Sequence, residues 1–200
     1  MQGPLPAADS FENIIQALLM AMEARDIKLR RNAERISKFA VQISDQLGLE
    51  ENERDLLYYG ALLHDIGNLG IPDAILLKPS GLTEWEFEEM KLHSIIGEQI
   101  CRPLRTADAL RPFIRSHHEK LDGSGYPDGL RGEEIPRLVR ILSVLDVYNS
   151  MRSERAYRDA LTHEQAIAEL RREAERGWWE GELVDLVADL TATDADFAPV

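Results

Sequence analysis

Residues 56–67, "LLYYGALLHDIG", form an apolar run that ends in a histidine and an aspartate. The spacing of the apolar side chains predicts a helix that starts at about Glu51, and the glycines and proline of "GNLGIPD" indicate its end. A buried carboxylate is unfavourable unless it is paired or bound to a cation. His64 and Asp65 are therefore either a structural pair or part of a functional site.

Helical signals continue on both sides of this stretch. Apolar residues recur three and four positions apart, and Thr83 with Glu86 and Thr162 with Gln165 have the pattern of a capping box. No stretch alternates like a strand, so we predict an all-α fold of about seven to eight helices. The other expected helices cover residues 14–22, 36–47, a segment from Thr83 through His93, 107–119, 137–151, a segment opening at Thr162, and 181–190.

The length and composition indicate one domain. Two hundred residues with 44% hydrophobic content can bury a full core. We expect a flexible segment at residues 1–10, one domain at 11–190 and a tail at 191–200. No run approaches the roughly 18 apolar residues of a membrane span, and the amino terminus lacks the features of a secretory signal. The sequence thus predicts a cytoplasmic protein with no membrane span in this chain.

The net charge argues against a general nucleic-acid-binding protein, and the cysteine content argues against an intrachain disulfide or a cysteine nucleophile. The formal net charge of -13 argues against general nucleic-acid binding, which relies on basic surface. An anionic ligand would need bound metals or clustered arginines. The lone cysteine, Cys101, cannot form an intrachain disulfide, and its apolar surroundings predict a buried hydrophobe rather than a nucleophile.

Two of the five histidines are adjacent in residues 116–130, "SHHEKLDGSGYPDGL". Neighbouring side chains on a helix point about 100° apart, so His117 and His118 do not both fit one apolar face. One interpretation is a polar helix end, where histidine is favoured by the negative end of the helix dipole. The other is a metal site, since paired imidazoles can reach one ion from a short segment.

The remaining chain favours the metal site. Asp146 lies in the strongly apolar segment 137–151, where a carboxylate needs a partner. His93 alone would indicate little, because a single histidine on a helix is more often a core or surface residue. Together with His64 and Asp65, these residues indicate a cluster of imidazoles and carboxylates.

Four motifs in this order and spacing resemble those of the HD-GYP family, a branch of the HD metal-dependent phosphohydrolases. The resemblance covers roughly residues 11–190 and implies an HD-type helical bundle and hydrolysis of the bacterial second messenger cyclic di-GMP to linear pGpG, GMP or both. The motifs are "HDIG", "MKLHS", "HHEKLDGSGYPDGLRGEEIP" and "RILSVLDVYNSMRSERAYR".

The resemblance also implies roles for individual residues. Asp65 would bridge two divalent transition-metal ions, with iron or manganese expected first and nickel, cobalt or zinc as alternatives. The implied metal ligands are His64, Asp65, His93, His117, His118, Asp146 and, at a position where the family has histidine, Asn32. The implied substrate-binding residues are Gly125, Tyr126 and Pro127 in a loop over the substrate, with Arg155 and Arg158 near its phosphates and guanines.

Three positions depart from the family pattern. Asn32 offers an amide oxygen in place of an imidazole. Asn68 stands where the family usually has a catalytic lysine near the scissile phosphate, and Asn149 where members often have aspartate. We therefore expect reduced phosphodiesterase activity.

Two other functions stay open from the sequence. One is a non-catalytic HD-GYP domain that binds a nucleotide or a signalling protein. The other is an HD enzyme that acts on mononucleotides or another phosphoester, against which the Gly-Tyr-Pro segment argues. Homodimer formation is also left open by the adjacent Trp178 and Trp179, which fit a contact surface as well as a core.

Overall fold

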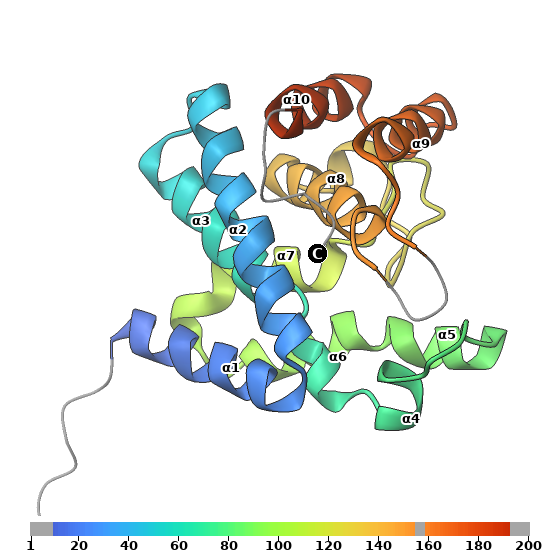
Figure 1. Ribbon diagram of the computed structural model, residues 1–200. Coiled ribbons are helices and arrows are strands. Elements are labelled where there is room, and N and C mark those ends of the chain that lie inside the picture. Colours follow the sequence, from blue (N-terminus) through green and yellow to red (C-terminus); the bar gives the residue numbers. More distant parts are fainter. Residues whose placement is uncertain (1–9, 155–158, 193–200) are drawn as a thin grey trace, which may run out of the picture.

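All regular secondary structure in the described part of the chain is helical. The computed structural model describes residues 10–154 and 159–192 (Figure 1). Its α-helices are α1 (Phe11–Arg25), α2 (Ile27–Leu47), α3 (Glu51–Leu63), α4 (Asp73–Leu76), α5 (Glu84–Lys91), α6 (His93–Cys101), α7 (Arg111–Ser116), α8 (Arg137–Met151), α9 (His163–Glu175) and α10 (Gly181–Thr191). Short 3₁₀ helices are η1 (Ile66–Gly70), η2 (Arg105–Leu110) and η3 (Gly132–Glu134). The all-α prediction is confirmed.

Among the described residues, five helices pack against α8. Helices α2 and α3 lie side by side, α1 crosses one end of them, and α8 contacts α2, α3 and α7 (Figure 1). Helices α9 and α10 cover α8 from the other side. The buried residues of α8 include Ile141, Leu142, Val144 and Leu145. The apolar packing of α8 therefore fixes the position of Asp146, which is half-buried on the same helix.

The helix ends follow the local sequence. The predicted capping boxes at Thr83 and Thr162 both form, so their hydroxyls accept from the amides of Glu86 and Gln165. At the other end of a helix, Gly48 caps α2 with φ of 60°, a conformation that favours glycine.

Two expected helices differ from those observed. The helix from Thr83 through His93 is divided at Leu92 into α5 and α6. The helix expected over residues 107–119 is η2 followed by α7, which has Pro112 in its first turn and ends at Ser116. A proline is tolerated in the first turn of a helix and not in its interior. Both interruptions place histidines at helix ends.

Cys101 and Trp179 are buried, and Trp178 is half-buried. Cys101 is buried, and burial raises the pKa of its thiol to about 11. Trp179 is buried and donates from Nε1 to a carboxylate oxygen of Glu173 at 2.8 Å. The Lys120 ammonium lies 3.1 Å from the centroid of the Trp178 ring. Both tryptophans thus make contacts within the chain.

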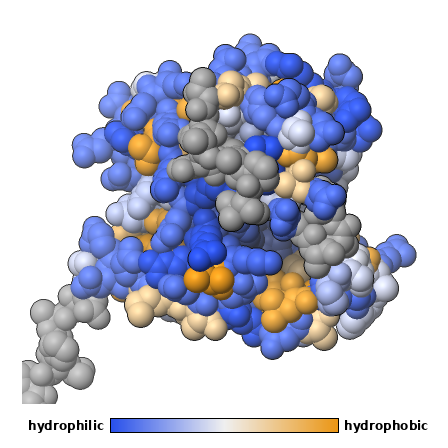
Figure 2. Space-filling model, in the orientation of Figure 1, coloured by the Kyte–Doolittle hydropathy of each residue, from blue (hydrophilic) through white to orange (hydrophobic). Residues whose placement is uncertain are grey.

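No helix among the described residues combines the length and apolar character that a membrane span requires. Figure 2 shows that hydrophilic residues cover most of one face of the molecule, with apolar residues in separate patches.

A close backbone contact joins η1 to α6. A Cβ atom at Gly67 would lie 1.7 Å from the carbonyl oxygen of His93 and 2.5 Å from the amide nitrogen of Gly97. Only glycine allows this approach, because any other side chain would overlap the backbone of α6. Gly67 thereby sets how close the start of α6, with His93, comes to Asp65.

We expect Gly67→Ala to lower the free energy of unfolding by about 3 kcal/mol, because α6 must move away from η1. Denaturant unfolding measures the change. Gly81→Ala is the matched control, since a Cβ there meets nothing within 4 Å, and its effect should stay within about 0.5 kcal/mol. Equal stability of the two variants would contradict the importance of this contact.

Candidate metal centre

Six of the predicted ligands come together from four places in the chain. His64 and Asp65 follow the last residue of α3, and His93 is the first residue of α6. His117 and His118 follow α7, and Asp146 lies on α8. Chain segments far apart in sequence therefore meet at one site.

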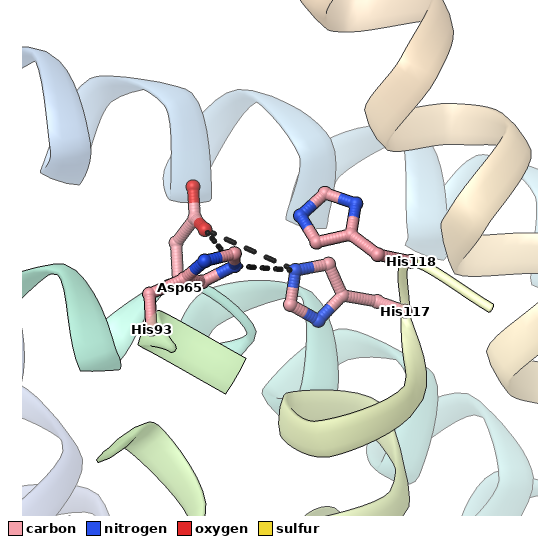
Figure 3. Close-up of side chains that lie close together, drawn as sticks. All are labelled: Asp65, His93, His117 and His118. Carbon is pink, nitrogen blue, oxygen red and sulfur yellow. Dashed lines mark hydrogen bonds and ion pairs between the residues drawn. The ribbon is translucent and has the colours of Figure 1, made fainter. Parts of the chain in front are cut away.

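Four of these residues form a tight cluster, shown in Figure 3. Each of Asp65, His93, His117 and His118 offers one ligand atom, and these atoms lie within 4.8 Å of one another. The Oδ1 atom of Asp65 is 3.5 Å from Nε2 of His93 and 3.9 Å from Nε2 of His117. His93 and His117 are buried, so the cluster is largely shielded from water.

Backbone carbonyls at helix ends orient three of the imidazoles. Nδ1 of His64 lies 2.8 Å from the carbonyl oxygen of Ala61, and Nδ1 of His93 lies 2.7 Å from that of Met90. Nδ1 of His117 lies 3.0 Å from the carbonyl oxygens of both Phe113 and Ile114. A carbonyl accepts only, so each Nδ1 carries the proton and each neutral ring leaves Nε2 as an acceptor.

These tautomers leave two acceptors facing each other. Nε2 of His93 and Nε2 of His117 are 3.3 Å apart, and in the neutral tautomers neither carries a proton. A proton is a poor bridge here, because burial lowers the pKa of His117 well below its usual range and the neighbouring imidazoles of His118, His64 and His93 lower it further. A metal cation fits between such lone pairs, as neutral imidazole is a common metal ligand.

His64 belongs to a second group of candidate ligands that shares Asp65. Its Nε2 atom is 3.5 Å from Oδ2 of Asp65 and 3.6 Å from Oδ1 of Asp146. This nitrogen is fully buried and has no hydrogen-bond partner among the described residues. Asp65 thus directs one carboxylate oxygen at His93 and the other at His64.

The electrostatics around His64 also favour a cation. Burial by itself lowers the pKa of His64, but the carboxylates of Asp65 and Asp146 outweigh it and raise the pKa to about 9. The same two carboxylates that favour a proton on Nε2 of His64 would favour a metal cation at that atom. A metal ion would replace that proton, since ligation requires the neutral ring.

The Gly-Tyr-Pro loop covers one side of this cluster. The amide of Tyr126 donates to the carbonyl of His118 at 3.2 Å, and the ring centroids of these two residues are 4.8 Å apart. Burial raises the pKa of the Tyr126 phenol, with help from Asp65 and Asp146, so the phenol keeps its proton. The Tyr126–Pro127 peptide is cis. A Cβ at Gly125 would lie 2.4 Å from the Cα of Glu119, which shows how tightly the loop packs against the histidine segment.

Glu119 holds this loop, a role that the sequence interpretation did not assign. Its buried carboxylate accepts hydrogen bonds from the amides of Asp128 at 2.7 Å, Gly129 at 3.1 Å and Leu130 at 3.0 Å. Burial raises the pKa of Glu119, and the three hydrogen bonds oppose that effect. Its position directly after His118 was the only signal in the sequence, and that position does not reveal what the side chain meets.

Ion pairs of Arg115 hold the part of the loop that contains Asp128. Arg115 donates through Nε and Nη2 to the two carboxylate oxygens of Asp128, both at 2.7 Å, and through Nη1 to Glu98 at 2.6 Å. This paired geometry is favourable for an arginine and a carboxylate. The loop is therefore anchored to both α6 and α7.

The remaining predicted residues differ in what surrounds them. Asn32, on α2, accepts from the guanidinium of Arg35 at 3.4 Å through Oδ1, and this is the contact that the structure describes for it. Asn68 is buried in η1, three residues after Asp65. Asn149 is buried on α8, and its Oδ1 has no hydrogen-bond partner among the described residues. Arg155 and Arg158 lie outside the described residues.

Comparison with known proteins gives matches over most of the chain. Residues 12–183 match the HD domain family. The cyclic di-GMP phosphodiesterase response regulator RpfG of Xanthomonas campestris pv. campestris is 41% identical over 163 residues, which cover 78% of this chain and 42% of that protein. The 3'3'-cGAMP-specific phosphodiesterase 3 of Vibrio cholerae is 37% identical over 84% of this chain and 36% of its own length.

A solved structure shares the fold. The structure of an HDG"Y"P protein from Bdellovibrio bacteriovorus superposes with a TM-score of 0.69 at 20% identity, over 82% of this chain and 52% of that one. The present chain spans about two fifths of the length of the two curated relatives.

We expect Glu119→Gln to lower the free energy of unfolding by about 1–3 kcal/mol, because an amide provides one acceptor oxygen for three backbone donors and turns an NH₂ group toward the others. Thermal and denaturant unfolding test this. Glu133→Gln, at an exposed position of η3, is the control and should leave stability unchanged. A Glu119→Gln variant as stable as wild type would show that the loop does not depend on this carboxylate.

Proposed function

Because this chain belongs to the HD-domain family and to its HD-GYP branch, we propose that it is a metal-dependent phosphodiesterase that hydrolyses cyclic di-GMP to linear pGpG, GMP or both. One observation carries the proposal: the Nε2 atoms of His64, His93 and His117 converge with the carboxylates of Asp65 and Asp146 beside the Gly-Tyr-Pro loop. The names of the two curated relatives support a cyclic dinucleotide as the substrate.

The proposed centre holds two divalent transition-metal ions. His93, His117 and His118 would bind one ion, His64 and Asp146 the other with Asn32 as a weak ligand, and Asp65 would bridge both. Imidazoles with carboxylates suit iron or manganese, with nickel, cobalt or zinc as alternatives. When bound, such ions act as Lewis acids that activate water and neutralise charge on the phosphodiester.

The chain's own residues supply orientation and shielding. The carbonyls of Ala61, Met90, Phe113 and Ile114 fix the imidazole tautomers, so the ligand atoms are in place before an ion arrives. Glu119 and Arg115 hold the loop that carries Tyr126 near His118. The protonated phenol of Tyr126 can donate a hydrogen bond to an anionic substrate. Arg155 and Arg158 stay proposed phosphate and guanine ligands.

A binding module without catalysis is the second candidate, and Asn32, Asn68 and Asn149 favour it. Each replaces a residue that the family usually has at the site with a neutral amide, so the second ion and the scissile phosphate both lose a strong partner. Such a domain would bind the nucleotide and pass the signal to a protein partner or a second copy of the chain. Incubation of metal-loaded protein with cyclic di-GMP and with 3'3'-cGAMP, followed by chromatography of the linear dinucleotides and mononucleotides released from each, distinguishes the two functions. Product from neither nucleotide would exclude the enzyme.

Metal analysis tests the proposed ligands. The purified protein should contain transition metal, and His117→Gln should weaken its metal affinity at least about tenfold, because an imidazole ligand is lost. His163→Gln is the matched control: this fifth histidine contacts Tyr148 at 2.9 Å and lies outside the cluster. Mass spectrometry of the metals in protein purified without chelators gives the readout. Absence of stoichiometric metal from the wild type, or equal loss in both variants, would contradict the proposed centre.

Restoring the family residues tests the activity itself. Asn32→His should raise metal occupancy and hydrolysis, since it returns an imidazole to the depleted ion. Adding Asn68→Lys supplies a cation near developing phosphate charge, and one such group can be worth ~10²-fold in rate. Asn52→His, at an exposed position of α3, is the control. Higher metal occupancy with no hydrolysis in any variant would favour the binding module, and a wild type that neither change improves would show that both asparagines are tolerated.

A further inference from the structure

Helix α5 carries apolar side chains that the core does not use. None of its residues is buried, although it includes an exposed tryptophan and phenylalanine. Phe87 is 46% exposed and Trp85 is 67% exposed. A large ring left in water beside a candidate site can serve to bind a ligand.

Phe87 is joined to the Gly-Tyr-Pro loop through a shared cation. The ring centroids of Phe87 and Tyr126 are 6.4 Å apart at an interplanar angle of 83°. The Lys91 ammonium lies 5.0 Å from the centroid of Phe87 and 5.5 Å from that of Tyr126. Phe87, Lys91 and Tyr126 therefore form one aromatic corner with a positive charge inside it.

This aromatic corner leads directly to the candidate metal centre. The Tyr126 ring lies 4.8 Å from that of His118 and 6.4 Å from that of His93. Phe87 is exposed to solvent, Tyr126 lies next to it, and the histidines lie on the buried side of Tyr126. A ligand whose phosphodiester reached the histidines would extend its next group over Tyr126 and Phe87.

The chemistry of the corner fits a guanine base. Aromatic side chains bind nucleobases by stacking on their π-faces. A lysine ammonium donates to O6 and N7 of guanine, which are both acceptors, whereas adenine presents an amino group beside N7. Lys91 also pairs with Glu88 at 2.6 Å, but exposed pairs one turn apart contribute little and are readily exchanged.

We propose that Phe87 and Tyr126 form a stacking site for one guanine base of the substrate, and that Lys91 recognises the O6 and N7 edge of that base. The inference rests on the proposed function and names the residues that select the base at the same site. Phe87 and Lys91 are positioned to bind the substrate and not to bind metal.

Equilibrium binding of cyclic di-GMP to metal-loaded protein tests the stacking role. Phe87→Ala should weaken the affinity about 5- to 100-fold, as base stacking on an aromatic ring typically contributes, whereas Phe87→Tyr should bind like wild type. Trp85→Ala is the matched control, since Trp85 lies about 200° around the same helix from Phe87. All variants should keep the metal content of the wild type.

The role of Lys91 is tested separately, by measuring the preference of the protein for guanine over adenine. The ratio of cyclic di-GMP affinity to cyclic di-AMP affinity should fall about tenfold in Lys91→Met, because guanine can accept from this donor at both O6 and N7, whereas adenine accepts only at N7. Loss of overall stability would not move this ratio, since both ligands would be affected alike.

The outcomes separate this inference from the proposed function. If the wild type neither binds nor hydrolyses cyclic di-GMP, the proposed function and the guanine site are both wrong. If it binds and Phe87→Ala binds equally well, or Trp85→Ala loses as much, only the stacking site is overturned. An unchanged guanine preference in Lys91→Met would likewise remove lysine from the recognition of the base.

Discussion

The site depends on hydrogen bonds between histidine rings and the last carbonyls of helices. His64, His93 and His117 each lie just after a helix or at the start of the next, and each Nδ1 meets a carbonyl three residues earlier. The last carbonyls of a helix have no partner within it, so a nearby N–H donor satisfies them. The same bond fixes the tautomer and aims Nε2 at a common centre. A histidine at a polar helix end can therefore also be a candidate metal ligand, so the two interpretations of this arrangement are compatible.

Packing of η1 against α6 brings the ligands into range. Gly67 allows the backbone of η1 to approach that of His93, and Asp65 lies two residues earlier on the same short segment. Asp65 can therefore direct Oδ1 at His93 and Oδ2 at His64. The half-buried carboxylate of Asp65 lies among imidazole nitrogens, and this arrangement would favour a bound cation.

The loop over the centre is held by charges that do not touch the ligands themselves. Glu119 satisfies three successive backbone amides, and Arg115 binds Asp128 on the far side. These contacts keep Tyr126 beside His118, where its ring lies between the histidine cluster and the side chains of Phe87 and Lys91. Because these contacts already order the loop, a ligand that binds there loses less free energy in ordering it.

The sequence by itself determined the helical class and indicated which residues are candidate ligands. Periodic apolar residues and the capping boxes at Thr83 and Thr162 are local signals, and a carboxylate such as Asp146 in an apolar helix indicates a partner wherever the helix packs. Only the tertiary structure decided where α5 ends and α6 begins, which nitrogen of each histidine faces the centre, and what Glu119 holds. Those features arise from contacts between segments distant in the chain, such as His93 with His117 and Gly67 with α6. Helical spacing fixes which face of a helix a residue occupies, but the distance between two helices is set by the side chains that pack between them.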